Sequence, residues 1–175
     1  MPPDLKLVHG YRPHDAVVLG IDPASRSGWS LFVRGKLIGS GVVESTGERL
    51  DVLQMAAEVF TDEGLPFVVV AETWSPGSWK SWNAIAAVHE PWGRWSEQLE
   101  LIGCSLIVRV LVNEWRRDLY GKNAVSSMPR KMAKMLAKQR VKSVYKKTVS
   151  DDEAEAILIG EWGCRAGAVA AAIAA

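Results

Sequence analysis

The chain lacks long apolar runs. Its 175 residues contain no stretch of eighteen apolar residues, which is the length that a membrane-spanning helix needs. Residues 1–15 lack the apolar core of a secretory signal peptide, and the alanine-rich stretch 166–175 is too short and too weakly apolar to cross a bilayer. Hydrophobic residues make up 48% and charged residues 23%, as in an ordinary soluble globular protein. We therefore expect a cytoplasmic protein with no membrane partner.

Cysteine is also scarce. Cys104 and Cys164 are the only two, and neither has a second cysteine or a histidine at a metal-ligand spacing. This pattern argues against a disulfide framework and against a zinc site, and it favours buried, reduced thiols. Any metal held by this chain is then expected to be a hard cation with oxygen ligands.

Acidic residues are nearly absent from one long segment. Between Arg116 and Lys147 the chain has eleven lysines and arginines but a single acid, Asp118, although the net charge of the whole chain is only +1. Such a block predicts a positive face or arm whose natural partner is an anionic polymer. A basic helix that is merely solvated is the alternative.

The pattern of apolar residues predicts one α/β domain over 16–175, after a flexible leader, 1–15, that contains three prolines. Strands are predicted at 16–22, 28–34, 36–43, 66–72 and 105–112, with a tight hairpin at Gly35 and Lys36. Helices are predicted at 49–64, at 79–102, at 114–120, from a cap at Ser127 to about 138 or beyond, and from 150 onward. This order predicts a mixed five-stranded sheet, three antiparallel strands and then parallel ones, with helices on both faces.

Four acids lie at the ends of these elements. Asp22 closes the first strand and Glu72 the fourth, while Asp152 and Glu155 stand three apart at the start of the last helix and so project from one face. An acid at the end of a buried strand is costly unless something pairs with it. The four predict a shared site for a divalent cation. Capping, local ion pairs and favourable helix-dipole contacts are the alternative roles, and Asp151 competes with Asp152.

The same residues carry a resemblance to the RuvC-type Holliday junction resolvases of the ribonuclease H-like superfamily. Residues 18–23 (VLGIDP) followed by 28–30 (GWS) resemble the first strand and hairpin of that family. Residues 68–72 (VVVAE) resemble its fourth strand, which ends in a catalytic Glu, and 152–158 (DEAEAIL) resemble its last motif. The chain departs from the bacterial pattern in having Glu155 where Asp is usual, no histidine in 146–150, and Trp74 one position from the family's junction-probing Phe. Residues 115–121 look more like the phage and organellar branches.

This resemblance implies the ribonuclease H-like fold and a metal-dependent endodeoxyribonuclease that resolves Holliday junctions. It implies symmetric nicks that leave 5′-phosphate and 3′-hydroxyl ends, made by a homodimer on four-way branched DNA without an organic cofactor. Two Mg²⁺ ions per site, which Mn²⁺ could replace, would be held by the catalytic acids Asp22, Glu72, Asp152 and Glu155, with Asp22 bridging. The protein would then act in the nucleoid, in a phage-infected host cell or in an organelle.

Contacts to DNA are predicted for aromatic and basic residues near the acids, where rings could stack on exposed bases and cations could grip phosphates. They are Trp74, Lys80, Trp82, Arg116, Arg117, Lys122, Lys142, Lys146 and Lys147. Simple packing is the alternative for Trp74 and Trp82, and Trp92 and Trp95 are expected in the core or in a dimer contact. A broader nuclease that cuts forks and flaps, and a junction-binding protein with weak catalysis, are the competing functions.

Overall fold

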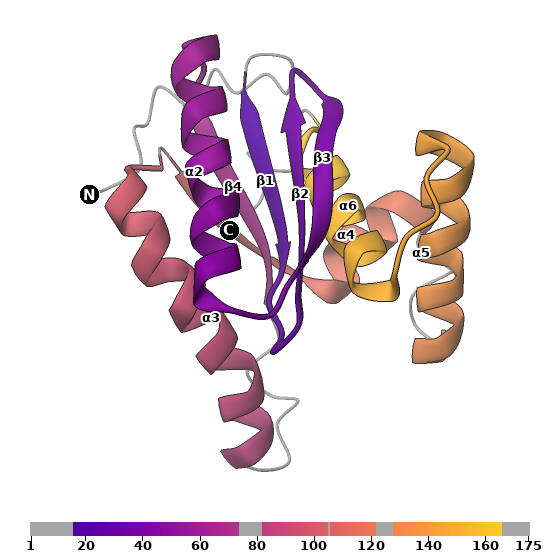
Figure 1. The fold of residues 1–175 in the computed structure, drawn as a ribbon. Coiled ribbons are helices and arrows are strands. Elements are labelled where there is room, and N and C mark those ends of the chain that lie inside the picture. Colours follow the sequence, from indigo (N-terminus) through magenta and orange to yellow (C-terminus); the bar gives the residue numbers. More distant parts are fainter. Residues whose placement is uncertain (1–15, 74–81, 105, 122–127, 166–175) are drawn as a thin grey trace.

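A five-stranded mixed sheet organises the computed structural model, which describes residues 16–73, 82–104, 106–121 and 128–165 (Figure 1). The strands are β1 (Val17–Asp22), β2 (Ser27–Val33), β3 (Lys36–Val43), β4 (Phe67–Thr73) and β5 (Leu106–Leu111). They lie in the order β3-β2-β1-β4-β5. The first three pair antiparallel, and β4 and β5 add parallel to β1. The predicted α/β sheet is confirmed.

Helices cover both faces of this sheet, as predicted (Figure 1). On one face lie α2 (Thr46–Glu63) and α3 (Trp82–Ile102), and the other face is covered by α6 (Asp151–Gly163) with α4 (Val112–Tyr120) and α5 (Arg130–Tyr145) around it. Each side has its own apolar core. Leu19 and Trp95 belong to the core under α2 and α3, and Val18 and Ile157 to the core under α6. Neighbouring residues of one strand therefore serve different cores.

The β2–β3 hairpin turns on Arg34 and Gly35, whose φ angles are 53° and 75°. Val33 pairs with Lys36, so the turn comes one residue earlier than predicted and Lys36 is already in the strand. A two-residue turn with both φ angles positive matches the twist of the flanking strands. Arg34 accepts this unfavourable conformation while its side chain pairs with Glu63 at the end of α2, at 3.2 Å.

Two helices begin earlier than predicted: α2, and α4, which begins at Val112 and not at 114, so that Val112 is helical and not the last residue of the strand. α2 begins at Thr46 and not at 49, because Ser45 and Glu48 form a capping box: the Ser45 hydroxyl accepts from Glu48 N, and Glu48 accepts from Ser45 N. α5 continues beyond 138, as the prediction allowed, and ends at Tyr145. The cap predicted at Ser127 is wrong, because α5 begins at Arg130 and its N-cap is Pro129. The leader 1–15 lies outside the described residues. α3 runs through Pro91, and α6 is capped by Ser150 as predicted.

Close packing of α6 against the sheet depends on glycine. A Cβ atom on Gly28 would lie 2.0 Å from the carbonyl oxygen of Asp152, and one on Gly20 would lie 2.5 Å from Gly160 N. The Ser30 hydroxyl, which is buried, donates to the carbonyl of Ala156 at 2.7 Å. The start of α6 is therefore held directly over the end of β1.

Two further expectations concern membrane-spanning helices and the cysteine thiols. Among the described helices none is long and apolar enough to cross a membrane. Cys104 and Cys164 are unpaired thiols, as expected, but both are half-buried and not fully enclosed.

Candidate active site

Strand alternation brings two of the four acids together. Asp22 and Glu72 lie near the carboxyl ends of the neighbouring parallel strands β1 and β4, where Ile21 pairs with Ala71. Val18 of β1 and Val70 of β4 face α6, so Asp22 and Glu72, an even number of residues further on, face it too. Asp152 in the first turn of α6 and Glu155 in the next reach the same place. Three elements distant in sequence therefore contribute carboxylates to one edge of the sheet.

The charges of these acids act on one another. The pKa of Asp22 is raised well above its usual value, first by burial and then by the carboxylates of Glu72, Glu155 and Asp152, while Lys134 opposes the rise. The pKa of Glu72 is raised to about 7, again first by burial and then by Glu155. The charges of the other three acids thus act on Asp22, and the charge of Glu155 acts on Glu72. The four carboxylates form a single acidic centre that is costly to ionise without cations.

Three of the four acids have partners from other elements. Trp115 Nε1 donates to Glu72 Oε2 at 2.8 Å, and Arg116 forms an ion pair with Glu155 Oε1. Asp152 lies 3.5 Å from Lys134 Nζ and 3.8 Å from Arg26 Nε. In the described part of the chain, no ion pair or side-chain hydrogen bond is made by Asp22. Asp22 is the least compensated member of the centre.

The neighbouring acid Asp151 has a different main partner. Its carboxylate pairs with Lys138 Nζ at 2.8 Å and lies 3.8 Å from Lys134 Nζ. The hydrogen bond from Lys138 is the main reason why the pKa of Asp151 is lowered. Asp152, and not Asp151, acts on the pKa of Asp22. The geometry therefore favours Asp152 over its competitor.

A divalent metal fits the chemistry of this donor set. Across residues 16–73, 82–104, 106–121 and 128–165, no three histidine, cysteine or carboxylate side chains are grouped closely enough to hold an ion in the present arrangement. Yet all four ligands are carboxylates, which hard cations prefer, and their mutual repulsion is what a cation would relieve. Two of the four carboxylates form ion pairs with basic side chains in this structure: Glu155 with Arg116, and Asp152 with Lys134. Metal ligation by the four acids stays a prediction.

The predicted DNA contacts have different surroundings. Trp74, Lys80 and Lys122 lie outside the described residues, and of Trp82 only its place at the start of α3 is described. Arg116 faces the acidic centre, whereas Arg117 is half-exposed and pairs with Asp118.

The lysines predicted to contact DNA also differ. Lys147 Nζ lies 2.6 Å from Glu153 Oε1 and also contacts Ser40, so it ties α6 to β3. Lys146 donates to the carbonyl of Ser143. Lys142 is exposed on α5. Lys142 and Lys146 are both exposed, and Lys146 makes a local hydrogen bond to Ser143.

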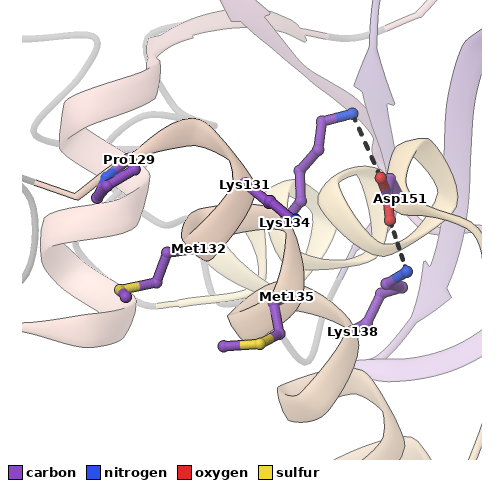
Figure 2. Close-up of a pocket in the computed structure, with 7 residues that line it drawn as sticks. All are labelled: Pro129, Lys131, Met132, Lys134, Met135, Lys138 and Asp151. Atoms are coloured by element: carbon purple, nitrogen blue, oxygen red, sulfur yellow. Dashed lines mark ion pairs between the residues drawn. The ribbon is translucent and has the colours of Figure 1, made fainter.

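Lys131, Lys134 and Lys138 of α5 were not among the residues predicted to contact DNA, whereas Lys142 was. Lys131, Lys134, Lys138 and Lys142 follow one another at spacings of three, four and four, which places them along one side of α5. That spacing was the signal available in the sequence. Several of these residues line an open cavity of about 530 Å³ (Figure 2). Figure 2 shows Lys134 and Lys138 reaching toward Asp151, while Met132 and Met135 point away from it.

Comparison with known proteins shows which solved structures share the fold of this chain. No protein-family model matches the chain, and no curated protein sequence matches it. Among solved structures it is similar to Thermus thermophilus RuvC in complex with a Holliday junction substrate, with a TM-score of 0.59, 16% identity, and coverage of 83% of this chain and 90% of that one. A second Thermus thermophilus RuvC structure has a TM-score of 0.54 at 17% identity, covering 85% and 93%. These structures confirm the predicted fold, a mixed five-stranded sheet of the RuvC type with helices on both faces.

Proposed function

We propose that this protein is a metal-dependent, structure-selective DNA endonuclease that resolves Holliday junctions. The observation that carries the proposal is the convergence of four carboxylates from β1, β4 and α6 on one edge of a RuvC-like sheet. One of the RuvC structures with this fold is in complex with a Holliday junction substrate. The reaction proposed is hydrolysis of two symmetry-related phosphodiesters, leaving 5′-phosphate and 3′-hydroxyl ends.

Asp22, Glu72, Asp152 and Glu155 would hold the metal. When bound, two Mg²⁺ ions, or Mn²⁺ in their place, would supply an activated water and neutralise the charge on the reacting phosphate. The chain's own contribution is to place the carboxylates. Trp115 fixes the Glu72 carboxylate with its indole N–H, and the packing of α6 on Gly28 sets the position of Asp152.

Lys134 and the lysines along α5 would hold the DNA backbone. The Lys134 ammonium lies 3.5 Å from Asp152 and acts on Asp22, so it stands where the scissile phosphate would approach the acids. Lys131, Lys138 and Lys142 continue this positive surface away from the centre. Lysines in such a row bind phosphates without reading sequence. Selectivity would then depend on the shape of the branch.

The assembly proposed is a homodimer on four-way branched DNA. A four-way junction offers two symmetry-related strands, and a two-fold dimer presents one acidic centre to each of them. Paired nicks then need no movement of the protein between the two cuts.

The decisive experiment compares Asp22→Asn with the parent on synthetic four-way junctions in Mg²⁺. We expect cleavage to fall about a hundredfold or more, because the loss of even an outer-shell partner of a metal ligand costs 10–100-fold. Asp51→Asn, an exposed acid of α2, is the matched control and should cleave like the parent. A folded Asp22→Asn protein that cuts as fast as the parent would refute the proposal.

Matched substrates test the specificity. We expect junctions to be cut in preference to forks, flaps and duplex, with nicks that DNA ligase reseals because their ends are 5′-phosphate and 3′-hydroxyl. Equal cutting of forks and flaps would indicate a broader debranching nuclease. Junction binding without cleavage in Mg²⁺ or Mn²⁺ would indicate a binding protein.

A further inference from the structure

Helix α4 presents two adjacent side chains to the acidic centre, and each contacts a different acid. Trp115, which is fully buried, donates to Glu72. Arg116 pairs with Glu155, and its guanidinium carbon lies 5.0 Å from the centroid of the Trp115 ring. The arginine is therefore held between an aromatic ring and a carboxylate at the centre itself. Its neighbour Arg117 points to the surface, where it pairs with Asp118.

The Arg116–Glu155 pair is largely removed from water. The exposed fractions of the two side chains are 19% for Arg116 and 9% for Glu155. An arginine stays charged in such a place, and its weakly hydrated, planar head suits buried ion pairs. Removing one partner of a buried pair leaves the other as an uncompensated charge. Glu155 therefore depends on a cation, and Arg116 is the cation that the chain itself provides.

We propose that Arg116 is an exchangeable counter-cation, which neutralises Glu155 in the metal-free protein and leaves this carboxylate when a divalent metal binds. This inference rests on the proposed role of Glu155 as a metal ligand. The metal and the guanidinium compete for the same carboxylate, whose Oε1 Arg116 contacts, and their like charges repel beside it. The metal affinity of the parent protein is therefore lowered by its own arginine. A released guanidinium would remain beside the centre, where a phosphate approaches.

The alternative is a fixed supporting role, in which Arg116 stays on Glu155 and orients it toward the metal. The two arrangements predict opposite changes in metal affinity when Arg116 is replaced. Loss of a supporting partner weakens metal binding by 10–100-fold in known metal sites. Loss of a competitor strengthens it. The affinity of the metal-free protein for Mn²⁺ separates them without any measurement of cleavage.

The test is calorimetric titration of Mn²⁺ into Arg116→Met, Arg116→Lys and the parent, with Arg117→Met as the matched control. We expect Arg116→Met to bind Mn²⁺ about tenfold tighter, since a buried carboxylate without its counter-charge gains the most from a cation. Arg116→Lys, which keeps the charge, should bind Mn²⁺ less tightly than Arg116→Met. Arg117→Met removes the same charge from the exposed side of α4 and should leave the affinity unchanged. Unchanged or weaker binding by Arg116→Met overturns the inference, as does a parent that binds no Mn²⁺.

Stability provides a second readout in case the methionine variant is poorly folded. Arg116→Gln keeps a donor without the charge, and the rise in melting temperature on adding Mn²⁺ should be larger in either neutral variant than in the parent. Neutral variants that do not fold even with Mn²⁺ present overturn the inference, because a competing metal should replace the arginine. If the parent cuts junctions but the affinities do not change, this inference alone fails. If exchange is observed without junction cleavage, the proposed function fails instead.

Discussion

The two faces of the sheet differ in what they bury, although the same strands supply both. Beneath α2 and α3 the core is built from large apolar side chains such as Leu19, Phe67 and Trp95. Beneath α6 an apolar core of similar kind ends at a cluster of four carboxylates with cationic partners. A step of one residue along β1 or β4 moves a side chain from one face to the other. Both faces thus hold a stabilising apolar core, and the α6 face also bears the acidic centre at a cost in stability.

The largest test of this comparison removes a side chain from the face under α2 and α3. Trp95→Ala should lower the free energy of unfolding by about 3–5 kcal/mol, because Trp95 is fully buried in the α2/α3 core. Chemical denaturation measures the loss. Leu101→Ala on the same helix, where the side chain is 83% exposed, should change stability by no more than about 0.5 kcal/mol.

Mn²⁺ affinity shows whether the two faces are independent. Measured well below the melting temperature, it should be the same in Trp95→Ala as in the parent. A marked loss of Mn²⁺ binding in folded Trp95→Ala would show that the two faces are coupled, and the comparison would break.

A smaller effect should distinguish the charged face by its pH dependence. The pKa of Glu72 is raised from 4.5 to about 7 and that of Asp22 is raised as well, so the folded state holds protons that the unfolded chain releases. Stability from these protons is fully present below the unfolded pKa and is lost as pH rises through the folded one. The metal-free protein should therefore lose about 3 kcal/mol for Glu72 between about pH 4.5 and 7.

Urea denaturation in EDTA across this pH range measures that loss. Glu72→Gln, which cannot ionise, should flatten the profile, whereas Asp51→Asn on the exposed side of α2 should not. Suppose that the free energy of unfolding increases from pH 4.5 to 7 and that Glu72→Gln does not change its slope against pH. The loss of stability could then not be assigned to the ionisation of these acids.

The smallest expected effect concerns the rim of the charged face. Lys142→Ala removes an exposed lysine of α5 and should weaken junction binding evenly across DNA sequences, lowering the slope of log affinity against log salt by about one. Fluorescence anisotropy over a range of salt concentrations measures both quantities. Lys36→Ala, at the start of β3, is the control and should leave the slope unchanged. Equal effects of the two substitutions would mean that α5 has no special part in binding DNA.

Much of the fold could be predicted because its signals are local. Alternating and continuous apolar runs located all five strands to within one residue at each end, and Ser150 with the acids after it located the start of α6. α2 begins three residues earlier than the apolar stripe indicates, because the capping box at Ser45 and Glu48 starts the helix at Thr46. The hairpin was displaced by one residue because Arg34, an unusual choice, takes a left-handed conformation.

The site was only partly predictable, because only some of its residues have a local signal in the sequence. Asp22, Glu72 and Asp152 end or begin regular elements, so their convergence follows from the sheet order and from alternation. Lys134 lies in the middle of a helix with many lysines, and nothing local distinguishes it from Lys131 or Lys138. Its distance of 3.5 Å from Asp152 results from the packing of α5 against α6.

By itself the sequence determined the order of strands and helices, the two faces of each strand and the four acids, because apolar periodicity and element ends are encoded by near neighbours. Only the tertiary structure decided which cation compensates which acid. Arg116 and Glu155 are 39 residues apart, and Lys134 and Asp152 are 18 apart. No local pattern relates such pairs. Their contacts arise when α4, α5 and α6 pack on one face of the sheet, where burial makes each carboxylate depend on the nearest positive charge.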